Sequence, residues 1–131
     1  MTAERPTELE LVILKTLWEQ SPLTARQIRE ALAQRGRKLA HTSVITMLQR
    51  MVDKRQLNQL DPVSGKAYRF MPRLSQGDVA GRMLGDLIDR VFDGSAEATM
   101  LSLFDVSDLD SEALKRLRRA FNRKTREKDH G

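Results

Sequence analysis

Five side chains between residues 42 and 50 are of types that hydrogen-bond to the bases and phosphates of nucleic acids. They recur at spacings of one, three and four, as on one side of a helix: Thr42, Ser43, Thr46, Gln49 and Arg50. Short hydroxyls, an amide and a guanidinium can reach base edges when a helix lies in a major groove. Because this stripe contains no acidic residue before Asp53, it predicts a helix that recognises DNA.

The stretch from Ala40 to Arg55, which contains this stripe, also has an apolar side. At helical spacing that side consists of Val44, Met47, Leu48, Met51 and Val52. An apolar helix face must pack against other elements, and we expect the segment that precedes it to supply them. The predicted recognition helix is therefore a surface element of a small helical domain.

Two helix-start signals precede this stretch. The segments Thr7–Glu10 and Thr24–Gln27 have the pattern of capping boxes, in which a threonine caps the helix and a Glu or Gln three residues later reaches back. The first helix is expected to end near Gln20, and the second near Gly36, because glycine is favoured just past helix ends. Two helices followed by the recognition helix make a helix-turn-helix framework.

After the recognition helix the pattern changes to two short segments, Gln56–Leu60 and Ala67–Met71. Proline and glycine in the intervening segment, Asp61–Lys66, predict a hairpin with a turn of five or six residues. Lys66 and Arg69 are expected on or near its tip and second strand. A hairpin that follows the recognition helix is the wing of a winged helix-turn-helix.

The chain is predicted to be mainly α with a small β-hairpin wing. Residues 1–72 form the winged-helix DNA-binding domain in this interpretation, and residues 73–131 a C-terminal helical dimerisation domain. In the second half, apolar residues recur at spacings of three and four: Met83, Leu84, Leu87, Ile88, Val91, Leu101, Phe104, Leu114, Leu117 and Phe121. A second copy would bury these faces around a two-fold axis. The alternative is that the helices fold back on the first half of the same chain.

Charge is distributed unevenly along the chain. The formal net charge is +5 and the sequence pI is about 10.0, which favours an anionic partner. Residues 1–72 hold 12 Lys and Arg against 7 Asp and Glu, whereas residues 73–131 hold 11 of each. Near the recognition helix, Arg37, Lys38 and His41 are placed to meet DNA. Taken alone, the basic excess fits a merely solvated face equally well.

The sequence lacks the residues that most enzyme and metal sites require. It contains no cysteine, and its two histidines, His41 and His130, are far apart. It has neither a phosphate-binding glycine loop nor a serine nucleophile motif. We therefore expect no catalysis, no metal and no cofactor. The absence of a signal peptide and of an apolar run of ~20 residues predicts a cytoplasmic protein without membrane insertion.

The ordered set of residues resembles a known family. The opening helices are similar to those of the penicillinase and methicillin-resistance repressors at Thr7–Glu10, Leu14, Leu17-Trp18-Glu19, Leu23-Thr24 and Ile28. The later part resembles them at Thr42-Ser43-Val44, Leu48, Arg50, Asp53-Lys54 and Tyr68-Arg69-Phe70. The resemblance covers nearly the whole chain and is concentrated in residues 7–72.

This resemblance implies a homodimeric winged-helix repressor that binds a dyad operator, often near its own gene. It implies that Thr42, Ser43, Thr46 and Arg50 face double-stranded DNA, with Lys66 and Arg69 as wing contacts. Some members have a basic residue where this chain has Ile45, so the operator sequence does not carry over.

The resemblance also bears on regulation. In β-lactam-responsive members, a membrane sensor-protease system inactivates the repressor by cutting an Asn-Phe bond in the dimerisation domain. The matching region here is Leu101-Ser102-Leu103-Phe104, which lacks Asn-Phe, so any cleavage would need a different specificity. Copper-responsive relatives use C-terminal cysteines, and this chain has none.

Three functions are compatible with these patterns. A sequence-specific transcriptional repressor acting as a dimer is favoured by the stripe at residues 42–50. A winged helix that docks another protein would favour a neutral or acidic stripe there. A non-specific architectural DNA binder would lose little affinity when its site is scrambled.

Overall fold

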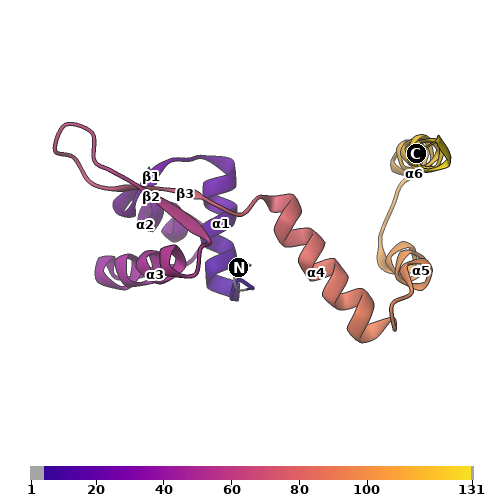
Figure 1. Ribbon diagram of the computed structural model, residues 1–131, viewed down its shortest axis with the longest axis horizontal. Helices are drawn as coiled ribbons and strands as arrows, with labels where there is room; N and C mark the ends of the chain where they lie inside the picture. Colours follow the sequence, from indigo (N-terminus) through magenta and orange to yellow (C-terminus); the bar gives the residue numbers. More distant parts are fainter. Residues whose placement is uncertain (1–4, 131) are drawn as a thin grey trace. The chain divides into compact units, whose positions relative to one another are not determined.

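The first elements of the chain are two capped helices. The computed structural model describes residues 5–130, with α1 at Glu8–Glu19 and α2 at Ala25–Gln34 (Figure 1). Both predicted capping boxes are confirmed: the Thr7 N–H donates to Glu10 Oε1 at 2.9 Å and the Thr24 N–H to Gln27 Oε1 at 2.8 Å. The cap threonines accept from the third helical N–H in return, so local chemistry defines where each helix begins.

Helix α2 and the helix predicted to recognise DNA end in the same way. Gly36 has a φ of +84°, and the N–H of Arg37 donates to the Leu32 carbonyl at 2.9 Å. This left-handed residue followed by a backward hydrogen bond is the Schellman motif. Helix α3 spans His41–Asp53 and ends similarly at Arg55, whose φ is +64°. The predicted stretch is therefore helical except at its ends.

The wing is an antiparallel hairpin of β2 (Leu57–Leu60) and β3 (Arg69–Pro72). Leu57 lies opposite Pro72 and Leu60 opposite Arg69, so residues 61–68 form the loop. The predicted turn of five or six residues is too short, because the second strand begins at Arg69 and not at the predicted Ala67. Pro62 has no N–H to donate to the next rung of the ladder.

A third strand completes the sheet and was not predicted from the sequence. β1 (Leu23–Thr24) pairs antiparallel with β3, with Leu23 opposite Phe70 and Thr24 opposite Arg69. The sheet order is β1-β3-β2. Two residues are too few to show an alternating pattern, so this strand exists only because β3 lies beside it. It joins the base of the wing to the start of α2.

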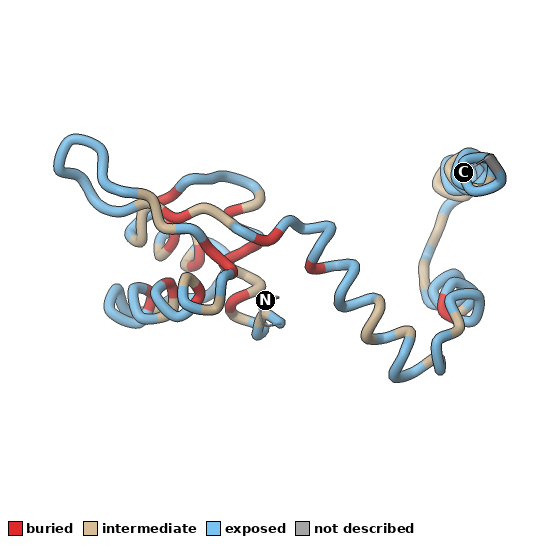
Figure 2. Tube along the Cα trace, viewed as in Figure 1, coloured by how far each residue is buried: buried red, intermediate tan, exposed pale blue. Residues whose placement is uncertain are grey.

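The core of the first unit is formed by the three helices and the sheet (Figure 2). Its buried apolar residues are Ile13, Leu14, Leu17, Leu23, Ile28, Leu32, Val44, Leu48, Met51, Leu57, Phe70, Leu74 and Val79. Trp18 packs against this core, and its indole N–H donates to the Leu74 carbonyl at 2.8 Å. The core thus continues past β3 to the start of α4 (Gln76–Val91).

The chain divides into two compact units, residues 1–85 and 86–131, with the boundary inside α4. The second unit contains the rest of α4, then α5 (Ala96–Val106) and α6 (Ser111–His130). Side chains cap the N-termini of α5 and α6. Ser95 Oγ accepts a hydrogen bond from the Ala98 N–H at 3.0 Å, and Asp110 Oδ1 accepts one from the Ala113 N–H at 2.8 Å. Mainly helical structure with a small sheet confirms the predicted fold class.

Burial differs sharply along the chain. Among residues 86–129, whose side chains the structure describes, only Thr99 is buried. The apolar residues of α5 and α6 are therefore exposed or half-buried. None of the helices within residues 5–130 is long and apolar enough to cross a membrane.

Candidate nucleic-acid interface

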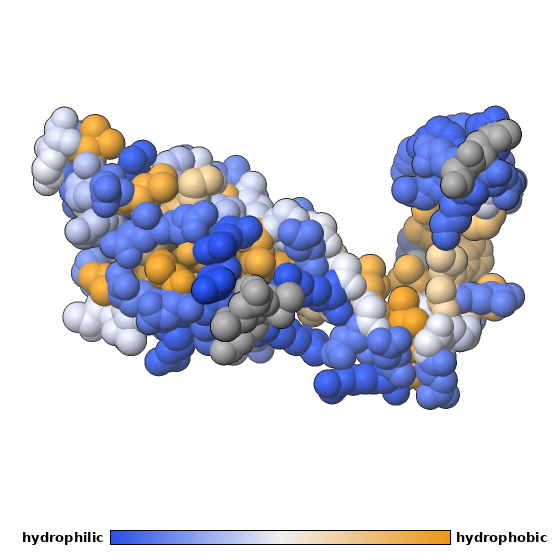
Figure 3. All heavy atoms as spheres, in the orientation of Figure 1, coloured by the Kyte–Doolittle hydropathy of each residue, from blue (hydrophilic) through white to orange (hydrophobic). Residues whose placement is uncertain are grey.

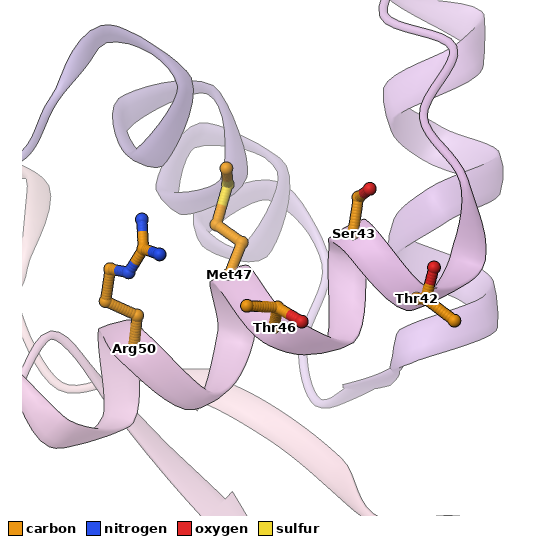
Figure 4. Close-up of a pocket in the computed structure, with 5 residues that line it drawn as sticks. All are labelled: Thr42, Ser43, Thr46, Met47 and Arg50. Carbon is orange, nitrogen blue, oxygen red and sulfur yellow. The ribbon is translucent and has the colours of Figure 1, made fainter.

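Four of the five residues in the predicted stripe lie together on the outer face of α3. Thr42, Ser43, Thr46 and Arg50 are exposed and, with Met47, line a shallow hollow of about 280 Å³ (Figure 4). We call these four residues the polar flank. Their hydroxyl and guanidinium groups offer hydrogen-bond donors and acceptors at a helix surface, as base edges and phosphates require.

Gln49 lies on a different side of α3. Its Nε2 donates to Gln59 Oε1 of β2 at 3.2 Å, which holds the amide toward the wing. His41 and Ile45 share that side with it, and we call these three residues the wing flank. Helical spacing alone placed Gln49 within one stripe, whereas the position of β2 decides which flank it joins.

Packing and one ion pair fix the orientation of α3. Val44, Leu48 and Met51 have no exposed surface, so the opposite face must point outward. At the C-terminal end of α3, Lys54 Nζ lies 2.9 Å from Glu10 Oε2, and the Glu10 side chain is only 3% exposed. This pair connects the end of α3 to the start of α1.

The Glu10 carboxylate serves two purposes in this arrangement. Burial on its own would raise the pKa of Glu10, but hydrogen bonds from the Thr7 N–H, Lys54 and Gln56, together with the charge of Lys54, lower it below its ordinary value. The sequence pattern identified Glu10 as a capping residue only. Its pairing with Lys54 joins residues far apart in the chain, so no local sequence pattern could predict it.

The predicted phosphate contacts have different surroundings. Lys38 and Lys66 are exposed, and Lys66 lies in the wing loop, where its N–H donates to the Val63 carbonyl at 3.2 Å. Arg37 is paired with Glu8 at 3.0 Å, in an ion pair exposed enough for solvent or DNA to displace. Arg69 is half-buried, and its Nη2 donates to the Asp61 carbonyl at 3.5 Å, across the base of the wing loop.

Two residues near α3 were absent from the predicted site. Arg26 of α2 and Tyr68 of the wing loop border the wing flank. Pairing of β1 with β3 brings the start of α2 beside the wing, so the position of Arg26 could not be foreseen. Tyr68 offered a signal, since it is the chain's one tyrosine and follows the turn.

Most of the predicted dimerisation residues are accessible to a partner. On α4, Met83, Leu84, Leu87 and Val91 are exposed and Ile88 is half-buried. The residues on α5 and α6 line a groove with a cavity volume of about 610 Å³: Leu101, Phe104, Leu114, Leu117 and Phe121. Figure 3 shows apolar residues at the surface of the part of the chain that holds these helices.

The predicted cleavage region lies inside α5. Leu101, Leu103 and Phe104 are exposed and Ser102 is half-buried. A protease needs an extended backbone, so a cut within a helix requires local unwinding. In the described residues 5–130, no three His, Cys, Asp or Glu side chains are grouped to hold a metal ion.

A helix-turn-helix with a wing and an exposed polar face on its third helix is the architecture of winged-helix DNA-binding domains. The chain belongs to the penicillinase repressor family, whose family model matches residues 6–123. It is similar to the transcriptional regulator BlaI of Mycobacterium tuberculosis strain CDC 1551 / Oshkosh, with 34% identity over 112 residues, 83% of this chain and 79% of that protein. The regulator of the same name from strain ATCC 25618 / H37Rv matches equally. The predicted family is confirmed, and the protein is a transcriptional repressor.

Proposed function

We propose that this protein represses transcription by binding a dyad operator as a homodimer, with α3 of each copy in a major groove. One observation carries the proposal. The polar flank is exposed on a helix whose opposite side is fixed in the core by Val44, Leu48 and Met51, none of which has exposed surface, so α3 presents its polar and wing flanks to a ligand.

The polar flank and the surrounding cations have separate tasks in this proposal. Arg50 and the hydroxyls of Thr42, Ser43 and Thr46 contact base edges, which gives sequence preference. Arg37, Lys38 and Lys66 contact phosphates, which adds affinity and register without sequence preference. Arg69 supports the wing from its base, where its guanidinium reaches the Asp61 carbonyl.

Dimerisation through residues 73–131 supplies a second recognition helix, which binds the second half-site of the operator. Two recognition helices related by a two-fold axis enter successive major grooves about 10–10.5 bp apart, or a multiple of that spacing. The exposed apolar faces of α4 to α6 support this assignment, because association would remove them from water. A dimer on promoter DNA would occlude RNA polymerase, and cytoplasmic DNA is the expected location.

Proteolysis by a membrane sensor system is the proposed means of release. A cut between Leu101 and Phe104 would sever α5 and remove lining residues from the α5–α6 groove. Loss of the dimer would separate the two half-site contacts and so lower operator affinity. The name of the family makes a penicillinase gene the first candidate for the regulated gene.

A footprinting and gel-shift experiment tests the proposal. The probe is the duplex upstream of this protein's own gene, and the competitor is a scrambled duplex of equal length. We expect a protected dyad and a complex that survives excess competitor. Equal loss to the scrambled duplex would replace the proposal with general phosphate binding, and no binding to either duplex would favour a protein-docking role.

A further inference from the structure

An apolar hollow borders the wing flank of α3. It has a cavity volume of about 360 Å³ and a surface that is almost entirely apolar. Ile45 lines it from α3 and Tyr68 from the wing loop, and these side chains are 41% and 50% exposed. Phe70 of β3 also lines it and is buried, so the hollow is open to solvent but rests on the core.

The lining of this hollow is held in place. Isoleucine is branched at Cβ and has one strongly preferred side-chain rotamer in a helix. Gln49 follows Ile45 by one turn, and its amide is hydrogen-bonded to Gln59 at 3.2 Å. Because the two amides that border the hollow bind each other, the wing flank presents a preformed apolar surface.

The polar and wing flanks therefore differ in the base chemistry they can recognise. The polar flank offers hydroxyls and a guanidinium, which suit the hydrogen-bonding groups of base edges. The hollow offers hydrocarbon. In the major groove, thymine alone adds an apolar group, its 5-methyl, to the edge of a base pair.

We propose that the hollow binds the 5-methyl group of a thymine in the operator, with Ile45 as the residue that determines this preference. The inference rests on the proposed function, because it requires α3 to lie in a major groove. Two observations favour DNA as the occupant. Ile45 and Gln49, which line the hollow, are the chain neighbours of Thr46 and Arg50 of the polar flank. His41 and Arg26 also line it, and the guanidinium of Arg26 pairs with Glu30 at 3.5 Å in an exposed ion pair that a phosphate can replace.

A uracil scan of the protected duplex tests this inference. Each thymine is replaced singly by deoxyuridine, which lacks only the 5-methyl group, and the wild-type dissociation constant is measured for each duplex. We expect one position in each half-site at which removal of the methyl weakens binding roughly fourfold, as for one buried methyl-sized group. Symmetric replacement in both half-sites should weaken it roughly sixteenfold.

The variant Ile45→Ala identifies the residue that contacts the methyl. It should bind the thymine and uracil duplexes with equal affinity, close to that of the wild type on uracil DNA. The matched control is Thr46→Ala on the polar flank, which should keep the fourfold ratio whatever its overall affinity. Because Ile45 is partly exposed, the thermal unfolding midpoint of Ile45→Ala should stay near that of the wild type.

The outcomes separate this inference from the proposed function. A wild-type protein that protects its dyad but binds every uracil duplex equally would overturn the inference and leave the repressor intact. So would an Ile45→Ala variant that keeps the ratio, since another residue would then contact the methyl. A small apolar ligand, which the volume of the hollow also admits, would likewise leave the scan flat. Failure to protect any dyad would overturn the proposed function itself.

Discussion

The two units of this chain use apolar residues in opposite ways. In the first unit, Ile13, Leu48 and Met51 have no exposed surface, and the exposed face of α3 is mostly polar. In the second unit, Leu101, Phe104 and Phe121 are each more than half exposed. The first unit completes its core within one chain. We infer that the second unit depends on association for the apolar burial that stabilises helices.

The largest expected effect comes from the closed core. Leu48→Ala should lower the free energy of unfolding of the first unit by about 2–5 kcal/mol, because it leaves a cavity beneath α3. Trp18 is the one tryptophan and packs against this core, so its fluorescence in a urea titration reports the first unit. The control, Leu103→Ala on exposed α5, should leave that transition unchanged. A loss below about 1 kcal/mol for Leu48→Ala would contradict the closed-core description.

The second unit should respond through association. Phe121→Ala removes an aromatic side chain from the α5–α6 groove and should weaken dimerisation by about 2 kcal/mol, roughly thirtyfold, as at an interface hot spot. Sedimentation equilibrium measures the dissociation constant. Lys124→Ala, on the same helix but outside the groove, is the matched control. Unchanged dimerisation in Phe121→Ala would favour helices that fold back on the first half of their own chain.

On the exposed surface of the first unit, Arg50→Ala should cost about 1–3 kcal/mol of operator affinity if its guanidinium binds a guanine. Competition with scrambled duplex shows whether the loss is specific to the operator. An operator affinity equal to that of the wild type would remove Arg50 from the interface.

Lys66→Ala is the counterpart of Arg50→Ala on the wing. It should weaken all duplexes alike and reduce the slope of log affinity against log salt by about 0.9 for each phosphate that the side chain neutralises. Gel shifts at several salt concentrations give the slope. A loss confined to the operator sequence would instead assign Lys66 to base recognition.

The smallest expected effect concerns pH and the part-buried pair of Glu10 and Lys54 at the C-terminal end of α3. The pKa of Glu10 is lower in the folded chain than its ordinary value of 4.5, so its contribution to stability is complete above about pH 4.5 and is lost as the pH falls through the folded pKa. Glu10→Gln should therefore be less stable than the wild type near neutral pH, and the difference should shrink in acid. Urea titrations followed by Trp18 fluorescence measure the free energies of unfolding of the variant and the wild type at neutral and at acid pH.

A matched control separates this pair from ordinary surface charge. Glu8→Gln removes a carboxylate that is 86% exposed and forms an ion pair with Arg37 at the surface. Its effect should be smaller and should depend on salt. If Glu10→Gln and the wild type lose stability in parallel below pH 4.5, another carboxylate governs the acid transition.

Much of the fold could be predicted because its signals are local. Thr7 and Thr24 begin their helices with hydrogen bonds to residues three positions away, and glycine permits the left-handed turn at Gly36. The apolar period of α3 identified its buried face for the same reason, since residues three and four apart lie on one side of a helix. The family followed from this ordered set of local signals.

The tertiary structure decided what depends on residues distant in sequence. β1 exists only through its pairing with β3, and Lys54 reaches Glu10 across more than forty positions. The predicted stripe divides into two flanks because Gln49 bonds to Gln59 of β2 and so lies on a different side from Thr46 and Arg50. The apolar hollow beside Ile45 forms only where the wing lies next to α3. A sequence pattern specifies which face of a helix is polar, because that follows from the helical repeat. It does not specify which neighbour each exposed side chain meets, because packing of the whole unit brings those neighbours together.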